Sequence, residues 1–388
     1  MQYIHHLPEW PHFQWSHERL TPPLAAARHR QGLLLGGMHT LGFHFRTQAN
    51  LENLAAEVIK SSAIEGTIFD PASVRSSIAR RMGLPPEKEA PSSREVEGAV
   101  DMLLDATQNY DQPLTEDRLL GWQAALFPAG RSGMQRILVG QWRTPEMDPM
   151  TVVSGPISRD RIRRKHIHFE APPADRLQRE VAAFLKWFET ADRTDPVVRA
   201  GIAHFWFVTI HPFEDGNGRV SRALADLVLA RSEGSALRFY SMSNQIEQEK
   251  QDYYHALETA QKGSLDITGW LEWFIGCFDR AVIEALRALE RIMKKAARWE
   301  QINQWFEPNE RQRKVLNALL DGAEEEISTS KFAKLAGTSL DTALRDIKQL
   351  VAAGVLKPGA GGGRSTKYLL APAVPAVGSD DFTVRPSA

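Results

Sequence analysis

The residues with the clearest capacity for chemistry lie in one short stretch, TIHPFEDGNGRVSR, which runs from Thr209 to Arg222. Glycines on both sides of Asn217 let the backbone turn tightly, so amide groups converge where a following helix begins. Free N–H groups at the start of a helix attract anions. Gly216, Asn217 and Gly218 therefore predict a phosphate-binding cradle.

The charged residues around this turn supply complementary chemistry. Arg219 and Arg222 are three residues apart, so both guanidiniums can lie on one side of the helix and bind further phosphate oxygens. Asp215 offers the hard oxygen ligand that Mg²⁺ uses together with substrate phosphates. His211 is the nearby group whose ordinary titration suits a general base at neutral pH. The set predicts transfer of a nucleotide phosphate to a hydroxyl.

Two apolar helical patterns must hold this loop. The first covers residues 196–210 and the second begins at Asn217, and each places its apolar residues at helical spacing. A capped turn between helices would explain the glycines and Asn217, but not His211, Asp215 and both arginines together. Neither a P-loop motif nor a full G-x-G-x-x-G motif occurs, which argues against those two nucleotide-binding folds.

Composition limits the class of protein. The chain has 388 residues, of which 43% are hydrophobic, and this predicts two or three globular domains. Lysine and arginine (47) nearly balance aspartate and glutamate (48), so any basic surface must be local. The single cysteine, Cys277, excludes an internal disulfide. No signal sequence and no apolar run of about 18 residues is found, so we expect a cytoplasmic protein without a membrane span.

Two further segments have patterns that matter for the site. Apolar residues between Leu51 and Ile59 predict a helix over about 51–66 that stops at Gly66. Ser61 and Glu65 are four residues apart on that helix, so the hydroxyl can steady the carboxylate. Downstream, β-branched residues at 151–153 and the run HIHF predict a β-hairpin.

The predicted secondary structure changes after Asn309, where the helices become short. Three short helices and a glycine-rich hairpin are predicted, and the arrangement resembles a winged helix-turn-helix with recognition helix 340–353 and wing 359–367. Seven basic and two acidic residues lie between Lys331 and Lys367, an excess of the kind that DNA attracts. Arg345, Lys348 and Arg364 would then contact DNA. A small module that docks a protein partner is the other interpretation.

The chain resembles the Fic-domain family. Every fixed position of the signature HxFx[DE]GNGRxxR is filled, by His211, Phe213, Asp215, Gly216, Asn217, Gly218, Arg219 and Arg222. The resemblance implies a mainly α-helical protein, with a Fic helical core and a β-hairpin flap in addition to the C-terminal winged helix. Members mostly transfer AMP from ATP to a hydroxyl side chain of a target protein.

The resemblance also implies roles for individual residues. His211 would deprotonate the target's Ser, Thr or Tyr hydroxyl, and Asp215 would hold Mg²⁺ on the α- and β-phosphates. The glycine turn would form the anion hole, the two arginines would bind the distal phosphates, and Phe213 would anchor the loop. The flap would pair with the target backbone through Thr151, Val152, Val153 and Ser154. The segment QDYYHAL resembles one near the adenosine, so Tyr253 or Tyr254 would contact it, and Tyr254 is the residue we select.

The stretch SSAIEG matches the family's inhibitory motif [ST]xxxE[GN]. In relatives such a glutamate reaches the second arginine of the signature, which is Arg222 here. The match implies a subclass with an N-terminal inhibitory helix, in which Glu65 and Ser61 restrain the enzyme. Taken alone, the same pattern is also that of an ordinary helix end.

These observations predict a domain plan and leave alternatives for function. We expect an N-terminal helical region (1–105), a Fic catalytic core (106–285), a linker helix (286–308), a winged helix-turn-helix (309–370) and a disordered tail (371–388). One alternative is removal of AMP, with Glu65 positioning a water. Another is a DNA-binding regulator whose core senses nucleotide. Family members often dimerise through the helical core, so a homodimer is also an option.

Overall fold

The computed structural model describes residues 2–85, 90–154, 166–359 and 366–372. The chain forms two compact units, residues 1–286 and 287–388, each of which is described by itself. The predicted N-terminal region and catalytic core both belong to the first unit. Most of the predicted tail, and Arg364 with most of the predicted wing, lie outside the described residues.

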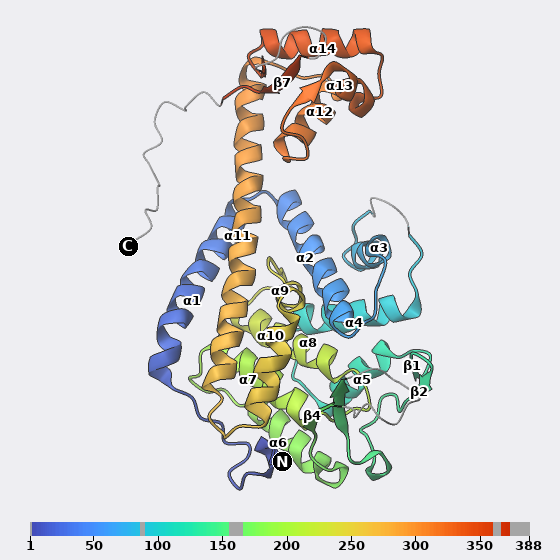
Figure 1. The fold of residues 1–388 in the computed structure, drawn as a ribbon, viewed down its shortest axis with the longest axis vertical. Coiled ribbons are helices and arrows are strands. Elements are labelled where there is room, and N and C mark those ends of the chain that lie inside the picture. Colours follow the sequence, from blue (N-terminus) through green and yellow to red (C-terminus); the bar gives the residue numbers. More distant parts are fainter. Residues whose placement is uncertain (1, 86–89, 155–165, 360–365, 373–388) are drawn as a thin grey trace. The chain divides into compact units, whose positions relative to one another are not determined.

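The first unit is mainly helical, as predicted, and Figure 1 shows its elements. The helices up to the catalytic loop are α1 (His17–Thr40), α2 (Phe43–Ile64), α3 (Pro71–Arg81), α4 (Arg94–Gln108), α5 (Glu116–Leu126), α6 (Leu177–Glu189) and α7 (Pro196–Ile210). They are followed by α8 (Asn217–Glu233), α9 (Met242–Gln248), α10 (Lys250–Gln261) and the long α11 (Thr268–Trp305), whose last part belongs to the second unit. Short 3-10 turns are η1 (Ile4–His6), η2 (Pro145–Met147) and η3 (Ala174–Arg176). None of the described helices is both long enough and apolar enough to cross a membrane.

Helix α2 corrects the predicted start of the inhibitory helix. It begins at Phe43, not near residue 51, and Gly42 in extended conformation precedes it. Phe43 and Phe45 are exposed, so the apolar stripe that marks the buried face begins only at Leu51. The apolar stripe therefore indicated only the buried part of the helix, and the first two turns were not predicted. At the other end the prediction is confirmed, because Gly66 has the positive φ of 85° typical of a helix stop.

Helices α7 and α8 form the centre of this unit and pack directly against each other. Asp195 caps α7, since its carboxylate accepts a hydrogen bond from the Val197 amide at 2.8 Å. Nearly all of α7 and most of α8 are buried, including the apolar positions on which the two helical predictions rested. The loop between them is therefore held at both ends by the core.

This unit also contains two small antiparallel hairpins. The first joins β1 (Arg131–Ser132) to β2 (Gln135–Arg136). The second joins β3 (Thr151–Ser154) to β4 (His166–Glu170), and its register pairs Val152 with Phe169. The second hairpin confirms the strands that the β-branched residues and the HIHF run predicted.

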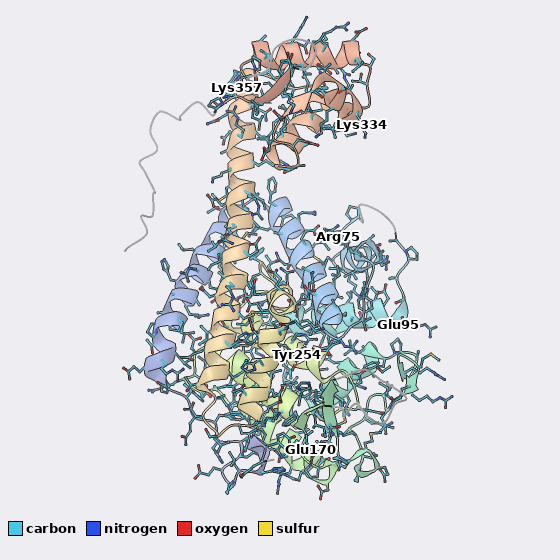
Figure 2. The ribbon with its side chains drawn as sticks, in the orientation of Figure 1. Arg75, Glu95, Glu170, Tyr254, Lys334 and Lys357 are labelled. Atoms are coloured by element: carbon cyan, nitrogen blue, oxygen red, sulfur yellow. The ribbon has the colours of Figure 1, made fainter. Side chains whose placement is uncertain are left out.

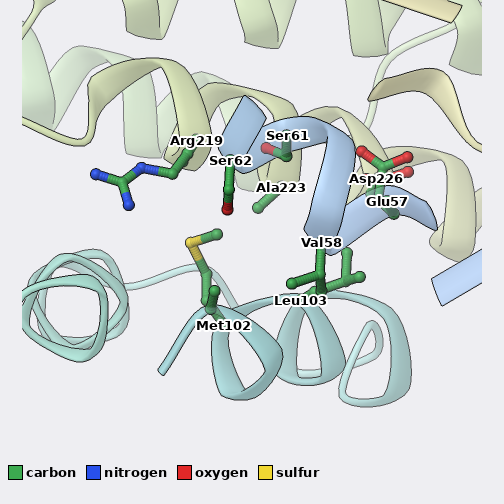
Figure 3. A pocket seen from close by; sticks show the side chains of 10 residues that line it. Glu57, Val58, Ser61, Ser62, Met102, Leu103, Arg219, Ala223 and Asp226 are labelled. Carbon is green, nitrogen blue, oxygen red and sulfur yellow. The ribbon is translucent and has the colours of Figure 1, made fainter. Parts of the chain in front are cut away.

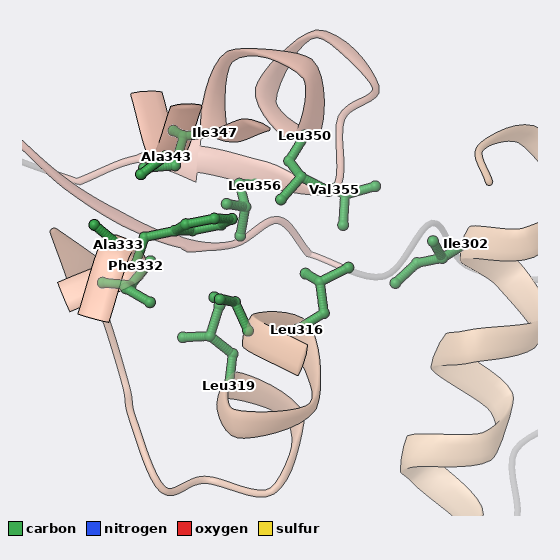
Figure 4. Packing of buried hydrophobic residues seen from close by; sticks show 12 residues of the cluster. Ile302, Leu316, Leu319, Phe332, Ala333, Ala343, Ile347, Leu350, Val355 and Leu356 are labelled. Atoms are coloured by element: carbon green, nitrogen blue, oxygen red, sulfur yellow. The ribbon is translucent and has the colours of Figure 1, made fainter. Parts of the chain in front are cut away.

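The second unit has its own core of buried apolar side chains, shown in Figure 4. Its helices are α12 (Glu310–Leu320), α13 (Thr329–Ala336) and α14 (Leu340–Ala352). Strands β5 (Ile327–Ser328), β6 (Leu356–Pro358) and β7 (Lys367–Leu370) form an antiparallel sheet in the order β5-β7-β6. The three short helices are those that the sequence predicted. Their assignment as a winged helix-turn-helix stays a prediction.

Candidate active site

The loop between α7 and α8 has an unusual backbone at its first residue. His211 follows Ile210 with φ 50° and ψ 56°, in the left-handed region. Among the described residues it is the only one other than glycine with a positive φ. Such a conformation costs energy and persists only where surrounding contacts hold it. The fold therefore fixes His211 more firmly than an ordinary loop residue.

The ring of His211 is oriented for base chemistry. Its Nδ1 lies 3.1 Å from the carbonyl oxygen of Val208. A carbonyl can only accept a hydrogen bond, so Nδ1 carries the proton and Nε2 keeps a free lone pair. Burial, the largest cause, lowers the pKa of His211 below its ordinary value of 6.5. The imidazole is therefore neutral at pH 7 and can accept a proton at Nε2.

Arg143 holds the backbone of this histidine. Its Nε donates to the His211 carbonyl at 2.9 Å, and its backbone amide donates to the Pro212 carbonyl at 2.9 Å. Its side chain is fully buried and forms an ion pair with Asp148 at 2.7 Å. Sequence reasoning missed this residue, because an arginine in an irregular stretch far from the motif carries no periodic signal.

The glycine turn has the geometry of the predicted cradle. Gly216 precedes α8 with φ 95°, and a Cβ there would come within 3.0 Å of the Phe127 ring. Position 216 therefore requires a glycine, because the backbone there is left-handed and the Phe127 ring leaves no room for a Cβ. The first amides of α8, beginning at Asn217 and Gly218, have no partner within the helix, because the first turn always leaves such groups free. The free amides can bind an anion.

Asn217 also fixes the loop with its side chain. Its Oδ1 accepts from the Phe213 amide at 2.9 Å, and its Nδ2 donates to the Phe213 carbonyl at 2.8 Å. Phe213 is fully buried and packs against Trp142, with 4.8 Å between ring centroids. The anchoring position predicted for Phe213 is therefore present. The amide side chain of Asn217 faces the loop backbone, so only its main-chain N–H is available to a ligand.

Asp215 has the donor chemistry for Mg²⁺. Its Oδ1 accepts from the Gly216 amide at 2.6 Å, and its Oδ2 accepts from the Ser132 hydroxyl. Each carboxylate oxygen has a second lone pair that these bonds leave available. No group of three or more potential metal ligands occurs among the described residues. A single carboxylate that shares its ion with phosphates and waters fits Mg²⁺, which seldom uses an all-protein cage.

Arg222 joins the loop to α2. Its Nη2 lies 2.8 Å from Oε1 of Glu65 and 2.9 Å from the carbonyl of Ser61, and its Nε donates to the Ser61 hydroxyl at 2.9 Å. Although burial opposes the charge, Glu65 raises the pKa of Arg222. The contact between Glu65 and Arg222 is the one expected from the inhibitory motif. Ser61 differs from the expectation, because its hydroxyl holds Arg222 and not Glu65.

The Glu65 carboxylate also lies against the start of α8. A Cβ built on Gly218 would come within 2.2 Å of Glu65 Oε1 and 3.2 Å of Arg222 Nη1. An anion therefore already lies beside the amides that the sequence assigned to phosphate. The absence of a side chain at position 218 leaves the room for it.

The two signature arginines contact different elements. The Arg219 guanidinium lies over the Phe127 ring, 4.7 Å from its centroid. Buried nitrogens on both arginines, Nε of Arg219 and Nη1 of Arg222, have no hydrogen-bond partner among the described residues. Burial lowers the pKa of Arg219. Figure 3 shows the small pocket between α2, α4 and α8 that Arg219 and Ser61 help to line. Unpartnered buried donors of this kind suit a ligand with several negative oxygens.

Tyr254 and Tyr253 have different surroundings. Tyr254, labelled on α10 in Figure 2, is 41% exposed, and its hydroxyl lies 3.4 Å from the Ile64 carbonyl at the end of α2. Burial of its ring raises the pKa of Tyr254 to about 12. Tyr253 is buried and bonds to His204 through its hydroxyl at 2.9 Å. Of the two, only Tyr254 has surface that a ligand could cover.

The predicted flap residues, Thr151, Val152, Val153 and Ser154, form strand β3. Within the part of the chain that the structure describes, β3 pairs with β4 alone. Its second edge therefore makes no strand pairing there, and strand addition requires such an unpaired edge. Residues 155–165, between the two strands, lie outside the described residues.

Two more residues that the sequence did not indicate support Asp215. Ser132, at the end of β1, donates to its carboxylate, and Gln123 on α5 donates to its carbonyl at 3.5 Å. Gln123 is fully buried and also accepts from the Gly140 amide at 2.6 Å. These contacts join segments that are distant in the sequence, so neither composition nor spacing could have revealed them.

Comparison with known sequences identifies two regions. Residues 113–229 match the Fic/DOC family, and residues 3–84 match a domain of unknown function, DUF4172. The protein adenylyltransferase Fic of Nematostella vectensis is 33% identical over 116 residues, which cover 29% of this chain and 25% of that protein. The protein adenylyltransferase Fic of Drosophila melanogaster is 32% identical over 133 residues, 33% of this chain and 25% of that one. The chain thus spans about a quarter of the length of these relatives.

Solved structures share the fold. A Fic family protein from Desulfovibrio desulfuricans G20 superposes with a TM-score of 0.51 at 21% identity, over 92% of this chain and 98% of that one. A Fic-domain signalling protein from Bacteroides thetaiotaomicron VPI-5482 has a TM-score of 0.51 at 19% identity, over 68% of this chain and 97% of that one. Identities this low establish the fold alone. Together with the signature and the family match, they show that residues 113–229 are a Fic/DOC domain.

Proposed function

We propose that this protein transfers AMP from ATP to a Ser, Thr or Tyr hydroxyl of a target protein. The observation that carries the proposal is the position of His211. Its Nδ1 proton is engaged by the Val208 carbonyl, its Nε2 is free, and it lies on the same short loop as the anion-binding start of α8. Two curated relatives that match this region are named protein adenylyltransferases.

The reaction needs one proton transfer and one substitution at phosphorus. Nε2 of His211 takes the proton of the target hydroxyl while the hydroxyl oxygen attacks the α-phosphorus in line. The bond from that phosphorus to the bridging oxygen breaks, and pyrophosphate leaves with the electron pair. The main-chain amides of Asn217 and Gly218 stabilise the developing negative charge. The Gly216 amide, which the sequence also assigned to the cradle, donates to the Asp215 carboxylate instead. Arg219 and Arg222 bind the distal phosphates, and Tyr254 contacts the adenosine.

Asp215 would hold Mg²⁺ beside these amides. When bound, the ion neutralises charge on the α- and β-phosphates and on the pyrophosphate that leaves. Ser132 and the Gly216 amide keep the Asp215 carboxylate in one orientation through their hydrogen bonds. Orientation of a ligand by its neighbours increases metal affinity.

We further propose that Glu65 restrains this activity. It forms an ion pair with Arg222 at 2.8 Å, and a γ-phosphate that uses Arg222 must displace it. The Glu65 side chain is 30% exposed, so water can solvate the carboxylate after displacement. Restraint of this kind is reversible, because Arg222 keeps its hydrogen bonds to the Ser61 hydroxyl and carbonyl when Glu65 is displaced.

Intact-mass spectrometry after incubation with ATP and Mg²⁺ tests both parts of the proposal. The proteins are the wild type, Glu65→Gly and the double variant Glu65→Gly/His211→Ala. A mass gain of one AMP in Glu65→Gly alone would support the transfer, the restraint and the base together. Glu247→Gly is a matched control, since Glu247 also pairs with an α2 side chain, Lys60, at 3.2 Å.

Other outcomes would change the proposal in stated ways. Equal modification of Glu65→Gly and the double variant would remove His211 from the mechanism. Equal modification of wild type and Glu65→Gly would remove the restraint. If no protein gains mass, incubation with an AMP-modified substrate tests the second reaction, removal of AMP, in which Glu65 positions a water.

A second candidate function concerns the C-terminal unit. Arg345 and Lys348 are exposed on α14, as a DNA-reading helix requires, but Lys331 and Lys367 form ion pairs with Glu324 and Glu326. If Arg345 and Lys348 contact DNA, the protein should give a gel shift with duplex DNA, and the shift should weaken as salt is added. The variant Arg345→Ala/Lys348→Ala should give no shift. An unchanged shift in that variant would contradict DNA binding through α14.

A homodimer through the helical core also stays a prediction.

A further inference from the structure

Arg143 is enclosed by groups from three separate segments. Its side chain donates through Nε to the His211 carbonyl, pairs with Asp148 at 2.7 Å and donates through Nη2 to the Pro172 carbonyl. Its backbone amide donates to the Pro212 carbonyl. Asp148 lies just before strand β3, and Pro172 lies just after strand β4. One side chain thus bonds both feet of the β3–β4 hairpin and the backbone of the histidine.

The contacts around the feet of the hairpin make this connection stiff. Oδ2 of Asp148 accepts from the Ala174 amide at 2.8 Å, and the Ala171 amide donates to the Met150 carbonyl at 2.9 Å. A guanidinium is planar and presents its donors in a fixed fork, so its three acceptors are held at fixed mutual positions. A lysine could supply the charge at this point but not the geometry.

We infer that Arg143 is a positioning residue that sets the distance between the strand-docking edge of β3 and the base His211. This inference rests on the proposed function, because it assumes that β3 receives the target and that His211 accepts its proton. A target strand paired with β3 presents its hydroxyl at a fixed place. Catalysis then needs His211 at a matching place, and Arg143 links the two.

The charge of Arg143 adds a second effect. Burial is the largest cause that lowers the pKa of His211, and the positive charge of Arg143 lowers it further. The charge therefore helps to keep the imidazole neutral. The guanidinium is itself buried, and burial lowers the pKa of Arg143. Because the charge and the fork of donors act separately, two substitutions can separate them.

The test uses the full chain with Glu65→Gly as parent and adds Arg143→Lys or Arg143→Met. Arg143→Met should raise the pKa of His211, followed by NMR of ¹³C-labelled histidine and assigned with His211→Ala. It should also slow AMP transfer at saturating ATP by about 100-fold, the effect of misplacing a reacting group by about 1 Å. Arg143→Lys should slow transfer similarly but leave the titration of His211 close to that of the parent. The Kd for ATP should stay unchanged in both.

Arg199→Met is the matched control. Arg199 is a mostly buried arginine that donates to the carbonyls of Trp187, Phe188 and Thr190. It lies twelve residues before His211 at the start of the same helix, which corresponds to about 18 Å along the axis. Its loss should lower the melting temperature without changing the rate at permissive temperature or the His211 titration. An equal effect of Arg199→Met on rate and titration would reduce Arg143 to a general stabilising role.

Each remaining outcome also decides the question. Normal transfer and an unchanged His211 titration in folded Arg143→Met would overturn the inference. If the Glu65→Gly parent transfers nothing, the proposed function fails, while the titration still shows whether Arg143 acts on His211. If neither Arg143 variant folds, Asp148→Asn weakens the hold on the hairpin and keeps the arginine. Slower transfer with an unchanged Kd for ATP is then expected, and an unchanged rate overturns the inference.

Discussion

Two buried arginines, Arg222 near the start of α8 and Arg238 just after its end, pair with carboxylates in different surroundings. Arg238 pairs with Glu233 at 2.9 Å and Asp226 at 3.2 Å, and both carboxylates are almost fully buried. Arg222 on α8 is as deeply buried, but its carboxylate partner Glu65 is 30% exposed. The first arrangement is closed on all sides, whereas the second has a partner that water or a phosphate can replace.

The difference indicates which ion pair can exchange its anion. Asp226 and Glu233 cannot leave Arg238 without the cost of a buried, unpaired charge. Glu65 can leave Arg222, because it lies at the end of α2 with water on one side. We therefore expect substitutions at the two arginines to act on different quantities, stability for Arg238 and nucleotide binding for Arg222.

The largest expected effect is on folding, at Arg238. Arg238→Met leaves two buried carboxylates without their cation and should lower the free energy of unfolding by about 3–5 kcal/mol. Urea titration at pH 7 measures it. Arg19→Met is the control, because its pair with Glu272 is exposed and should change stability by about 1 kcal/mol or less. Similar losses in the two variants would contradict the comparison.

The second effect is on nucleotide binding, at Arg222. In a Glu65→Gly background, Arg222→Met removes charge-assisted hydrogen bonds of about 1.5–3 kcal/mol each, so ATP should bind roughly 10- to 100-fold more weakly. Isothermal titration calorimetry with ATP and with AMP should show the larger loss for ATP, since the distal phosphates are affected. Arg231→Met, on the same helix but paired with Glu189, should bind ATP normally. A Kd for ATP that Arg222→Met leaves unchanged would break the assignment.

A third effect depends on pH through His204, a fully buried residue of α7. Burial, and after it the charge of Arg222, lowers the pKa of His204 to about 3. The unfolded state binds this proton below about pH 6.5, so stability is full above that pH. It is lost as pH falls toward 3, by about 1.4 kcal/mol per pH unit.

His204→Gln should remove this part of the acid sensitivity. Urea unfolding at pH 7 and pH 5 measures the difference in stability between the two conditions. The exposed residue His12 provides the control, and His12→Gln should behave as wild type. If wild type and His204→Gln lose equal stability on acidification, the neutral buried state of His204 is wrong.

The smallest effect on stability is expected at Glu65. Glu65→Gln keeps the size of the side chain and an oxygen that can accept from Arg222, but removes the charge, and should lower the free energy of unfolding by about 1–2 kcal/mol. The rate of AMP transfer should nevertheless rise, because Arg222 becomes available. Glu247→Gln removes a similarly exposed partner from Lys60. It should change the free energy of unfolding no more than Glu65→Gln does, and it should leave the rate of AMP transfer unchanged. A rise in transfer in both variants would show that Glu65 has no special role.

Sequence reasoning located the parts of the site that are contiguous. The signature loop, the two core helices around it and the β3–β4 hairpin all depend on local spacing, and the structure has each of them. Sequence reasoning failed at the start of α2, because the helix extends to Phe43 beyond its buried apolar stripe. It also failed for Ser61, whose hydroxyl accepts a hydrogen bond from Arg222 and does not contact Glu65. Periodicity detects burial on one face, and it does not detect exposed turns or rotamers.

The sequence by itself determined the local geometry, because the glycines, Asn217 and the apolar spacing constrain only nearby backbone. Tertiary structure decided which distant groups meet there. Glu65 reaches Arg222 across 157 residues, and Arg143 reaches His211 across 68. Those contacts follow from how the helices pack, and packing depends on the whole core at once. The restraint and the positioning proposed here both depend on contacts of that second kind.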